Sequence, residues 1–336
     1  MSTAEIYDLI DQDSGEEIDH GQTVRDTFPD ADFFLRIDSN TDTQIKSRVE
    51  RFLHLILGTR VITPSSSETA MYLAASASGN SACLSRQVGA ALTDGSGNIV
   101  AVGWNDVPRF TGNLYISDLK KDPNSVNDKR CWNLDGGLCF NDREKKTIAE
   151  LLVNELIEKH FVREEDRSAA VANVLENSKV KDLIEFSRAI HAEMHAIILG
   201  SQLAGERVKG GILYCTTYPC HSCARHIIAA GITTVYYIEP YRKSLAVKLH
   251  DDAITEEETD MSKVRILPYD GISPTRYLKL FRVGKSARKA GGKMAIANPK
   301  IASPKVDKTL EALPTLEALV VRGLKDKRLI PDEEVK

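Results

Sequence analysis

The stretch that decides the fold covers residues 211–238 and reads GILYCTTYPCHSCARHIIAAGITTVYYI. Gly211–Thr216 and Thr234–Ile238 are short apolar runs of the kind that form buried strands. Between them, His221–Ala230 has helical spacing and is followed by a glycine, a normal C-terminal stop. A further helix is predicted over Ser187–Leu203, just before the first strand. This alternation predicts a layered α/β sheet with parallel pairing.

Upstream of this stretch the sequence predicts two helices and a hairpin. Asp42–Leu57 has apolar residues at helical spacing and stops at Gly58. Glu68–Leu84 is a second helix, rich in alanine. Val88–Thr93 and Ile99–Trp104 are short β-rich runs joined by the turn sequence DGSGN, so they are predicted to pair as a hairpin.

The region between the hairpin and the decisive stretch holds a long loop and further helices. Residues 105–142 are polar and rich in Gly, Pro and Asn. Loops of that length are uncommon and are usually functional or mobile. Arg143–His160 has an amphipathic helical pattern, and more helix is predicted over Ala169–Leu175 and Val180–Phe186.

The composition is that of an ordinary globular chain. Its 336 residues are 42% hydrophobic and 27% charged, which suffices for one sizeable core and permits two domains. The net charge is -4, whereas proteins that hold long nucleic acids by their phosphates usually have a basic balance; no stable long nucleic-acid partner is therefore expected. No apolar run is long enough to span a bilayer, and the acidic start lacks the pattern of a signal peptide. We therefore expect a cytoplasmic protein with no membrane partner.

Two short motifs carry chemistry, HAE at residues 191–193 and PCHSC at residues 219–223. A Cys-x-x-Cys pair at a helix start brings the thiolates of Cys220 and Cys223 within reach of one ion, and His191 supplies a third ligand. Zinc accepts sulfur and imidazole nitrogen, and a catalytic zinc site keeps three protein ligands and one water. The predicted cofactor is therefore a Zn²⁺ ion.

Glu193 lies on the same predicted turn as His191 but is not needed as a ligand. Zinc lowers the pKa of a bound water toward about 7. A neighbouring carboxylate takes the proton of that water and passes it to a leaving amine, so Glu193 is the predicted catalytic residue. H-x-E followed by P-C-x-x-C is the known signature of the zinc nucleobase deaminases. The alternatives are a redox pair, which needs no HAE, and a structural zinc site, which needs a fourth Cys or His.

On these motifs the chain resembles the deoxycytidylate deaminase family. The resemblance implies a cytidine-deaminase-like three-layer α/β/α sandwich with a central five-stranded mixed sheet and extra helices. It also implies homo-oligomers and an asparagine, here Asn105, that contacts the deoxyribose. The segments that match are residues 219–232, residues 191–197, the SRQVGA at 85–90 and the GWN at 103–105.

A more specific resemblance is to the bacterial anti-phage dCTP deaminases, which deplete dCTP during infection. It covers roughly residues 20–283, and members of that group often carry an N-terminal kinase-like domain with a phosphate-binding loop. The resemblance divides this chain into an acidic leader and helix similar to the end of such a domain (1–60) and a deaminase domain (61–283). The residues that follow are basic and without apolar pattern, which predicts a mobile C-terminal tail (284–336). The segments that carry the resemblance are Asp26–Phe34, Thr63-Pro64, Cys83–Gln87, Asn105–Pro108, Lys243–Ala246, Leu249–Asp251 and Pro268–Phe281.

Positive charges near the motifs are candidates for phosphate contacts. Arg86 precedes the hairpin, and Lys243 follows the last predicted core strand, where loops commonly face a ligand. A triphosphate needs such charges, but exposed solvated side chains are an equal alternative. Cys131 and Cys139 in the long loop are read as solvent-side thiols, with a second zinc site as the alternative, and His195 as a packed histidine or one that supports the ligands.

The sequence therefore predicts hydrolysis of dCTP to dUTP and ammonia in antiviral nucleotide depletion. The first alternative is a dCMP deaminase that makes dUMP for thymidylate synthesis. Two further alternatives belong to other classes, an editor of cytosine in polynucleotides and a non-catalytic nucleotide sensor on a deaminase scaffold. The intact Glu193 disfavours the sensor, and the acidic balance disfavours the editor.

Overall fold

The chain forms two compact units, residues 1–39 with 64–275, and residues 40–63 with 276–336. None of the helices described is both long and apolar enough to cross a membrane. The predicted acidic leader over residues 1–20 lies outside the described residues, as do Lys285 and Arg288 of the predicted basic tail. The computed structural model describes residues 27–28, 30–37, 40–134, 136–241, 244–282, 289–295, 297–305, 317–318 and 320–325.

The first unit is built on a mixed sheet with the strand order β3-β2-β4-β5-β7-β6. β2 pairs antiparallel with both β3 and β4, and the remaining neighbours pair parallel. The predicted mixed α/β sheet is confirmed, and a sixth, two-residue strand is added to the five that the resemblance implied, because buried Ile254 and Thr255 pair with the edge of β7. The strands are β2 Gly89–Thr93, β3 Ile99–Trp104, β4 Ile212–Thr217, β5 Thr234–Glu239, β6 Ile254–Thr255 and β7 Val264–Pro268.

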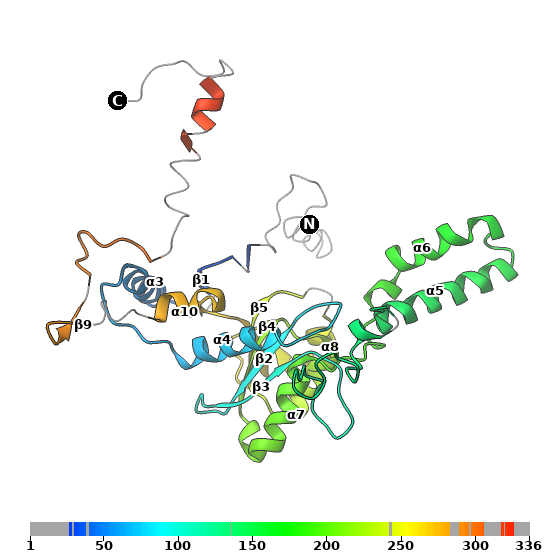
Figure 1. The fold of residues 1–336 in the computed structure, drawn as a ribbon, viewed down its shortest axis with the longest axis horizontal. Helices are drawn as coiled ribbons and strands as arrows, with labels where there is room; N and C mark the ends of the chain where they lie inside the picture. The colour runs from blue at the N-terminus through cyan, green and yellow to red at the C-terminus, as the bar shows by residue number, and fades with distance from the viewer. Residues whose placement is uncertain are drawn as a thin grey trace. The chain divides into compact units, whose positions relative to one another are not determined.

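Helices cover both faces of this sheet. The main ones are α4 (Ser66–Ser78), α7 (Ala192–Ala204) and α8 (His221–Ala229). Successive side chains of a strand point to opposite faces. On β2, Ala90 and Leu92 pack with α7 and α8, whereas Ala91 packs with α4. The unit is therefore the predicted three-layer α/β/α sandwich, with α4 and α7 on opposite sides of the strands (Figure 1).

Two glycines let the helices approach the sheet closely. A Cβ at Gly89 would overlap the carbonyl group of Ala74 in α4. A Cβ at Gly103 would lie 2.6 Å from the carbonyl oxygen of Ala192 and 2.5 Å from the amide nitrogen of Ala196. Such distances are too short for any side chain, so only glycine permits the close contact of β3 with the first turn of α7.

Two predicted helices differ from the observed ones at their ends. α7 begins at Ala192 instead of Ser187, because Ile190 forms a β-bridge with Asp106 and His191 is extended at φ -75° and ψ 154°. α4 ends at Ser78 instead of Leu84, because Gly79 caps it.

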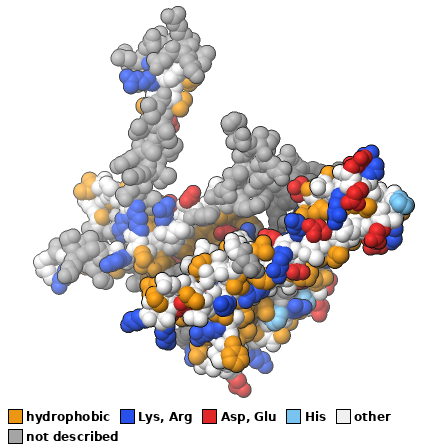
Figure 2. Space-filling view, turned by 45° about the vertical axis from the view of Figure 1, so that its right-hand side comes forward, with side chains coloured by type: hydrophobic (Ala, Val, Ile, Leu, Met, Phe, Trp, Pro, Cys, Tyr) orange, Lys and Arg blue, Asp and Glu red, His pale blue; other side chains and the backbone are white. Residues whose placement is uncertain are grey.

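The region between β3 and α7 contains the helical hairpin α5–α6, which projects beyond the sheet in Figure 1. α5 covers Phe140–Glu158 and α6 covers Arg167–Asn177, close to the predicted ranges. Only a short 3₁₀ turn, η3 (Lys179–Asp182), forms where a helix to Phe186 was predicted. Acidic and basic side chains alternate on the hairpin (Figure 2), and they form exposed pairs such as Lys146–Glu150.

The long loop before α5 is held by a buried ionic cluster. The Arg130 guanidinium lies 2.6 Å from the Asp128 carboxylate and 3.2 Å from that of Asp106, and it also donates to Ser117 Oγ. The side chains of Arg130, Asp128 and Asp106 are at most 6% exposed. Buried charges are stable only when paired and hydrogen-bonded, and this cluster meets that condition. It fixes the start of the loop directly after Asn105.

The second unit contains the helix predicted over Asp42–Leu57, which is α3 and has those ends. Thr41 forms a capping box with Gln44, and Gly58 ends the helix in the left-handed conformation at φ 64°. The same unit holds α10 (Tyr277–Phe281) and the short hairpin of β9 (Lys289–Ala290) and β10 (Lys293–Met294).

Candidate active site

The three predicted zinc ligands meet at one point of the first unit. His191 Nδ1 lies 3.2 Å from Cys223 Sγ and 3.3 Å from Cys220 Sγ. All three ligand atoms are within 4.8 Å of one another, and the described parts of the chain contain no other such group of His, Cys, Asp or Glu. Ligands of a tetrahedral zinc at ordinary bond lengths lie ~3.6 Å apart. One nitrogen and two sulfurs at this spacing fit a zinc ion with one open position.

Two helix N-termini place these ligands. His191 is the N-cap residue of α7, Cys220 is the N-cap residue of α8, and Cys223 lies in the first turn of α8. The backbone N–H of Cys223 donates to Cys220 Sγ at 3.4 Å. The positive end of α8 favours the thiolate of Cys220, the form in which cysteine binds a metal.

The protonation of the ligands follows from their mutual hydrogen bonds. Hydrogen bonding with Cys223 and with His191 lowers the pKa of the Cys220 thiol to about 4. The hydrogen bond with Cys220 raises the pKa of His191 to about 9 against the effect of burial. Cys220 is therefore a thiolate at neutral pH, ready to bind a cation. The hydrogen bond with Cys220, together with burial, raises the pKa of the Cys223 thiol. A metal-bound imidazole is neutral and a metal-bound cysteine is a thiolate, so binding of zinc would release protons from His191 and Cys223.

Glu193 lies beside the ligand group without joining it. Glu193 is only 4% exposed, and burial raises the pKa of its carboxyl. The nearby charge of His191 offsets part of this increase. A carboxyl whose pKa is raised toward neutrality is suited to accept and donate protons in turn. The described structure thus places a buried carboxyl outside the group of three ligand atoms, and the role of Glu193 in proton transfer stays a prediction.

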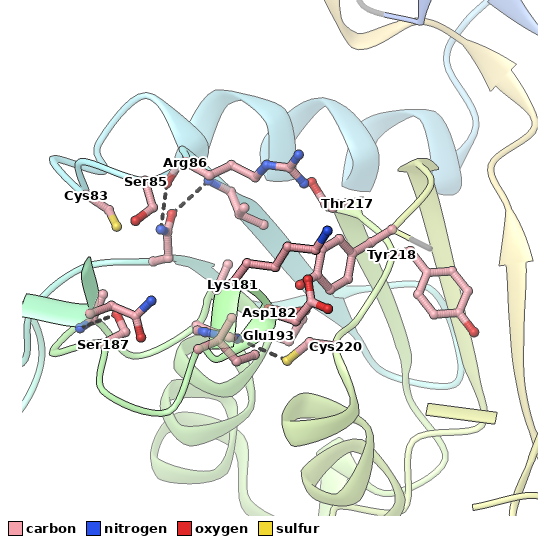
Figure 3. A pocket seen from close by; sticks show the side chains of 18 residues that line it. Cys83, Ser85, Arg86, Lys181, Asp182, Ser187, Glu193, Thr217, Tyr218 and Cys220 are labelled. Carbon is pink, nitrogen blue, oxygen red and sulfur yellow. Dashed lines mark hydrogen bonds between the residues drawn. The ribbon is translucent and has the colours of Figure 1, made fainter. Parts of the chain in front are cut away.

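A pocket of about 380 Å³ opens onto these residues (Figure 3). The volume lies in the range of small-ligand sites. His191, Glu193 and Cys220 are among its lining residues, and Glu193 and Cys220 are buried. Val88, Asn105, Thr217, Tyr218 and Tyr241 contribute to its walls, and Arg86, Lys181 and Asp182 are among the remaining lining residues.

Of the three predicted substrate contacts, the structure places Asn105 and Arg86 at the pocket. Asn105 Oδ1 accepts a hydrogen bond from the Val88 amide at 2.7 Å, and its Nδ2 donates to the Arg86 carbonyl oxygen at 2.7 Å. The Arg86 side chain is exposed. Lys243 lies outside the described residues.

His195 is a packed histidine that connects α7 to Trp104 of β3 and to Asn113 of the long loop. Its Nδ1 accepts from the Trp104 amide at 3.2 Å, and its Nε2 lies 3.1 Å from Asn113 Oδ1. Burial lowers the pKa of His195, so the ring is neutral and Nε2–H donates to Asn113. The ring also packs edge-on against the Trp104 indole, 4.8 Å between centroids.

The remaining cysteines do not form a second metal group among the described residues. Cys83, Cys131 and Cys139 line a small cavity beside the pocket, with Cys83 lining both, and all three are half-buried and form no disulfide. Cys139 Sγ lies 3.7 Å from Ser85 Oγ. No His, Asp or Glu of the described residues joins these thiols in a metal-like cluster, and Cys131 and Cys139 are half-buried instead of lying on the solvent side as predicted.

Sequence reasoning missed the pocket residues that come from the helical insertion. Asn141, Lys181, Asp182 and Ile184 all line the pocket. They belong to α5, η3 and the segment that follows, and no motif marks them. Only the return of the hairpin to the sheet brings them beside His191.

The comparison with known proteins agrees with this geometry. Residues 64–239 match the family model of the cytidine and deoxycytidylate deaminase zinc-binding region. The chain belongs to this family. The match confirms the predicted family, the predicted enzyme class and the predicted zinc ion.

Relatives of the deaminase match over short segments. ComE operon protein 2 of Bacillus subtilis (strain 168) is 41% identical over 80 residues, 23% of this chain and 42% of that protein. The deoxycytidylate deaminase of enterobacteria phage T2 is 32% identical over 84 residues, 25% of this chain and 43% of that protein. The chain therefore spans less than half the length of these curated relatives. The crystal structure of the dCMP deaminase from the cyanophage S-TIM5 in complex with dCMP and dUMP is also similar, at 21% identity and a TM-score of 0.35 over 62% of this chain and 99% of that one.

Proposed function

We propose that this chain hydrolyses the amino group of a deoxycytidine nucleotide, with dCTP as the substrate and dUTP and ammonia as products. The observation that carries the proposal is the buried Glu193 beside the group of His191, Cys220 and Cys223, in a pocket whose lining also includes the exposed cations Arg86 and Lys181. Membership in the deaminase family supports the reaction type.

The residues of the chain divide the work. When bound to His191, Cys220 and Cys223, zinc supplies the Lewis acidity that makes water nucleophilic at neutral pH. Glu193 accepts a proton from the water that attacks C4 of the cytosine. It delivers protons to N3 and then to the exocyclic amine, so that the C4–N4 bond breaks and ammonia leaves. Asn105 lies beside the sugar, where it holds the backbone of Arg86 and Val88 as one wall.

dCTP is proposed over dCMP because of the resemblance to the anti-phage dCTP deaminases, and the charge of Arg86 at the pocket supports a polyphosphate. A homo-oligomer in the cytoplasm that depletes dCTP during phage infection is part of the same proposal. Production of dUMP from dCMP is the second candidate, since the phage T2 relative is named a deoxycytidylate deaminase.

The two candidates of other classes are less well supported. A sensor would not require Glu193 to be buried at the ligand group. An editor of polynucleotides usually presents an extended basic groove with aromatic side chains. Here the net charge is -4, and the helical hairpin carries charges of both signs (Figure 2).

The test is a substrate panel with the purified zinc-loaded chain. dCMP, dCDP, dCTP, CTP and single-stranded DNA are incubated in parallel, and the uracil products and ammonia are quantified. We expect dCTP to be converted with the highest kcat/KM. Turnover of none of the nucleotides by a folded, zinc-loaded protein would contradict the proposal, and Glu193→Gln serves as the inactive control.

A further inference from the structure

The helical insertion between β3 and α7 returns to the pocket at η3. Lys181 and Asp182 of η3 line the same pocket as Glu193, and so does Asn141 at the start of α5. Figure 3 shows the Lys181 side chain stretched out in the pocket, with its amine among the labelled lining residues. The turn η3 follows the start of the β2–β3 hairpin by about 90 residues in the sequence. It nevertheless forms part of the pocket wall.

Hydrogen bonds from α5 hold the backbone of η3 at Lys181 in place. Lys145 Nζ donates to the Lys181 carbonyl oxygen at 2.9 Å, and Asn141 Nδ2 donates to the Leu183 carbonyl oxygen at 3.0 Å. Both bonds join α5 to η3 and its next residue. The insertion is therefore closed at its base, and Lys181 is presented from an anchored turn.

The charge of Lys181 is available to a ligand. The neighbouring Asp182 carboxylate lies 3.6 Å from the amine of Lys179, whose side chain is 99% exposed. Within the described part of the chain, no carboxylate pairs with Lys181, which is exposed and lines the pocket, whereas Lys179 does not line it. Arg86 adds a second exposed cation to the lining.

The distribution of charge in the pocket matches that of a nucleotide, which has an uncharged base and negatively charged phosphates. Glu193, the proposed proton-transfer carboxyl, is a buried lining residue and acts on an uncharged base. The cations Arg86 and Lys181 are exposed lining residues, and the one carboxylate near them in the lining, that of Asp182, is paired with Lys179. We propose that Lys181 binds the 5′-phosphates of the substrate, so that the helical insertion is a specificity-determining part of the active site. This rests on the proposed function, because it takes the substrate to be a cytosine nucleotide.

The experiment compares Lys181→Ala with Lys179→Ala, a matched removal of the adjacent lysine of the same turn. Steady-state kinetics are measured with dCMP and dCTP, and deoxycytidine, which lacks phosphates, is measured as a competitive inhibitor. For Lys181→Ala we expect KM for the preferred nucleotide to rise roughly tenfold to a hundredfold with kcat nearly kept, as for loss of a charge-assisted contact. The inhibition constant of deoxycytidine should stay unchanged, Lys181→Arg should restore most of the affinity, and Lys179→Ala should match the parent.

Three outcomes would overturn the inference. One is nucleotide kinetics of Lys181→Ala equal to those of Lys179→Ala, which would make Lys181 a solvated side chain. Another is an equal loss of nucleotide and deoxycytidine affinity, which would make its role structural. The third is a failure of Lys181→Arg to restore binding in a variant with normal melting temperature and zinc content. Failure of the proposed function is distinct, since the parent protein itself would then convert no nucleotide.

Discussion

Asn105 Nδ2 donates a hydrogen bond to the carbonyl oxygen of Arg86 at 2.7 Å. The same amide accepts from the Val88 N–H, so both ends of the side chain hold the segment that enters β2. Asn105 is only 7% exposed, and its residue still lines the pocket. The asparagine that the family resemblance assigns to the deoxyribose therefore also shapes one wall of the pocket.

Replacing Asn105 with Ala should lower both stability and turnover. The variant removes the side-chain partners of the Val88 N–H, in a half-buried residue, and of the Arg86 carbonyl, in an exposed one, so the loss is about that of ordinary hydrogen bonds, ~0.5–1.5 kcal/mol each. We expect a lower melting temperature and an equal fractional loss of kcat/KM with dCMP and dCTP, because the sugar is common to both. Asn133→Ala, in a loop that does not line the pocket, is the control for stability alone. A loss with only one of the two nucleotides would contradict a role at the sugar.

Removing a zinc ligand should cost metal and stability together. Cys220→Ser leaves His191 and Cys223 as two of the three ligands, so elemental analysis should fall from about one zinc per chain toward zero. Binding of the metal is coupled to folding, so thermal unfolding should begin at a lower temperature. Cys83→Ser removes a half-buried thiol outside the ligand group and should keep the zinc. Active protein without zinc would overturn the ligand assignment.

Glu193→Gln should separate proton transfer from metal binding. The amide keeps the shape of the side chain but neither takes up nor releases a proton near neutral pH, so kcat should fall at least roughly 10²–10⁴-fold. Glu193 lies outside the group of three ligand atoms, and zinc content and melting temperature should therefore be kept. If zinc is lost together with activity, Glu193 is a ligand and the division of roles is wrong.

Asp94, in the turn between β2 and β3, should make the free energy of unfolding depend on pH in the acid range. The Arg207 guanidinium, 2.6 Å from the Asp94 carboxylate, and hydrogen bonds from Asn98 and Ser96 lower the pKa of Asp94 to about 2. The pKa in the unfolded chain is about 3.9. The folded state thus binds the proton less tightly, and the stabilisation is complete above pH ~4 and is lost as the pH falls toward 2.

Asp94→Asn should therefore flatten the decrease in the free energy of unfolding between pH 4 and pH 2. Urea titrations at several pH values measure the free energy of unfolding. Arg207→Ala should reduce the same pH-dependent decrease, but by less than Asp94→Asn does. Glu176→Gln, an exposed carboxyl on α6, is the control. An unchanged slope in Asp94→Asn would show that Asp94 does not contribute.

The sheet and the ligand group were predictable because their signals are local. The apolar runs of β4 and β5, and the helix between them, lie within 28 residues, and HAE and PCHSC sit at the starts of α7 and α8. The start of α7 was mispredicted, since the β-bridge of Ile190 with Asp106 joins residues 84 positions apart. For the same reason the part of the pocket made by Lys181 could not be predicted: it depends on how the α5–α6 hairpin returns to the sheet, and helical periodicity carries no information on that return.

Arg86→Ala should report on the number of phosphates in the substrate. Its carbonyl oxygen stays bonded to Asn105, so the variant removes an exposed cation from the pocket without releasing the wall. If the guanidinium binds the β- or γ-phosphate, kcat/KM for dCTP should fall roughly tenfold to a hundredfold, since a contact to a charged group contributes about 1.5–3 kcal/mol, while dCMP is little affected. Arg109→Ala, an exposed arginine that does not line the pocket, is the matched control. Equal losses with both nucleotides would place Arg86 at the α-phosphate, which the two share. Rapid turnover of dCMP by the parent protein with none of dCTP would reject the dCTP proposal and its antiviral role, and would leave a dCMP deaminase in ordinary nucleotide metabolism.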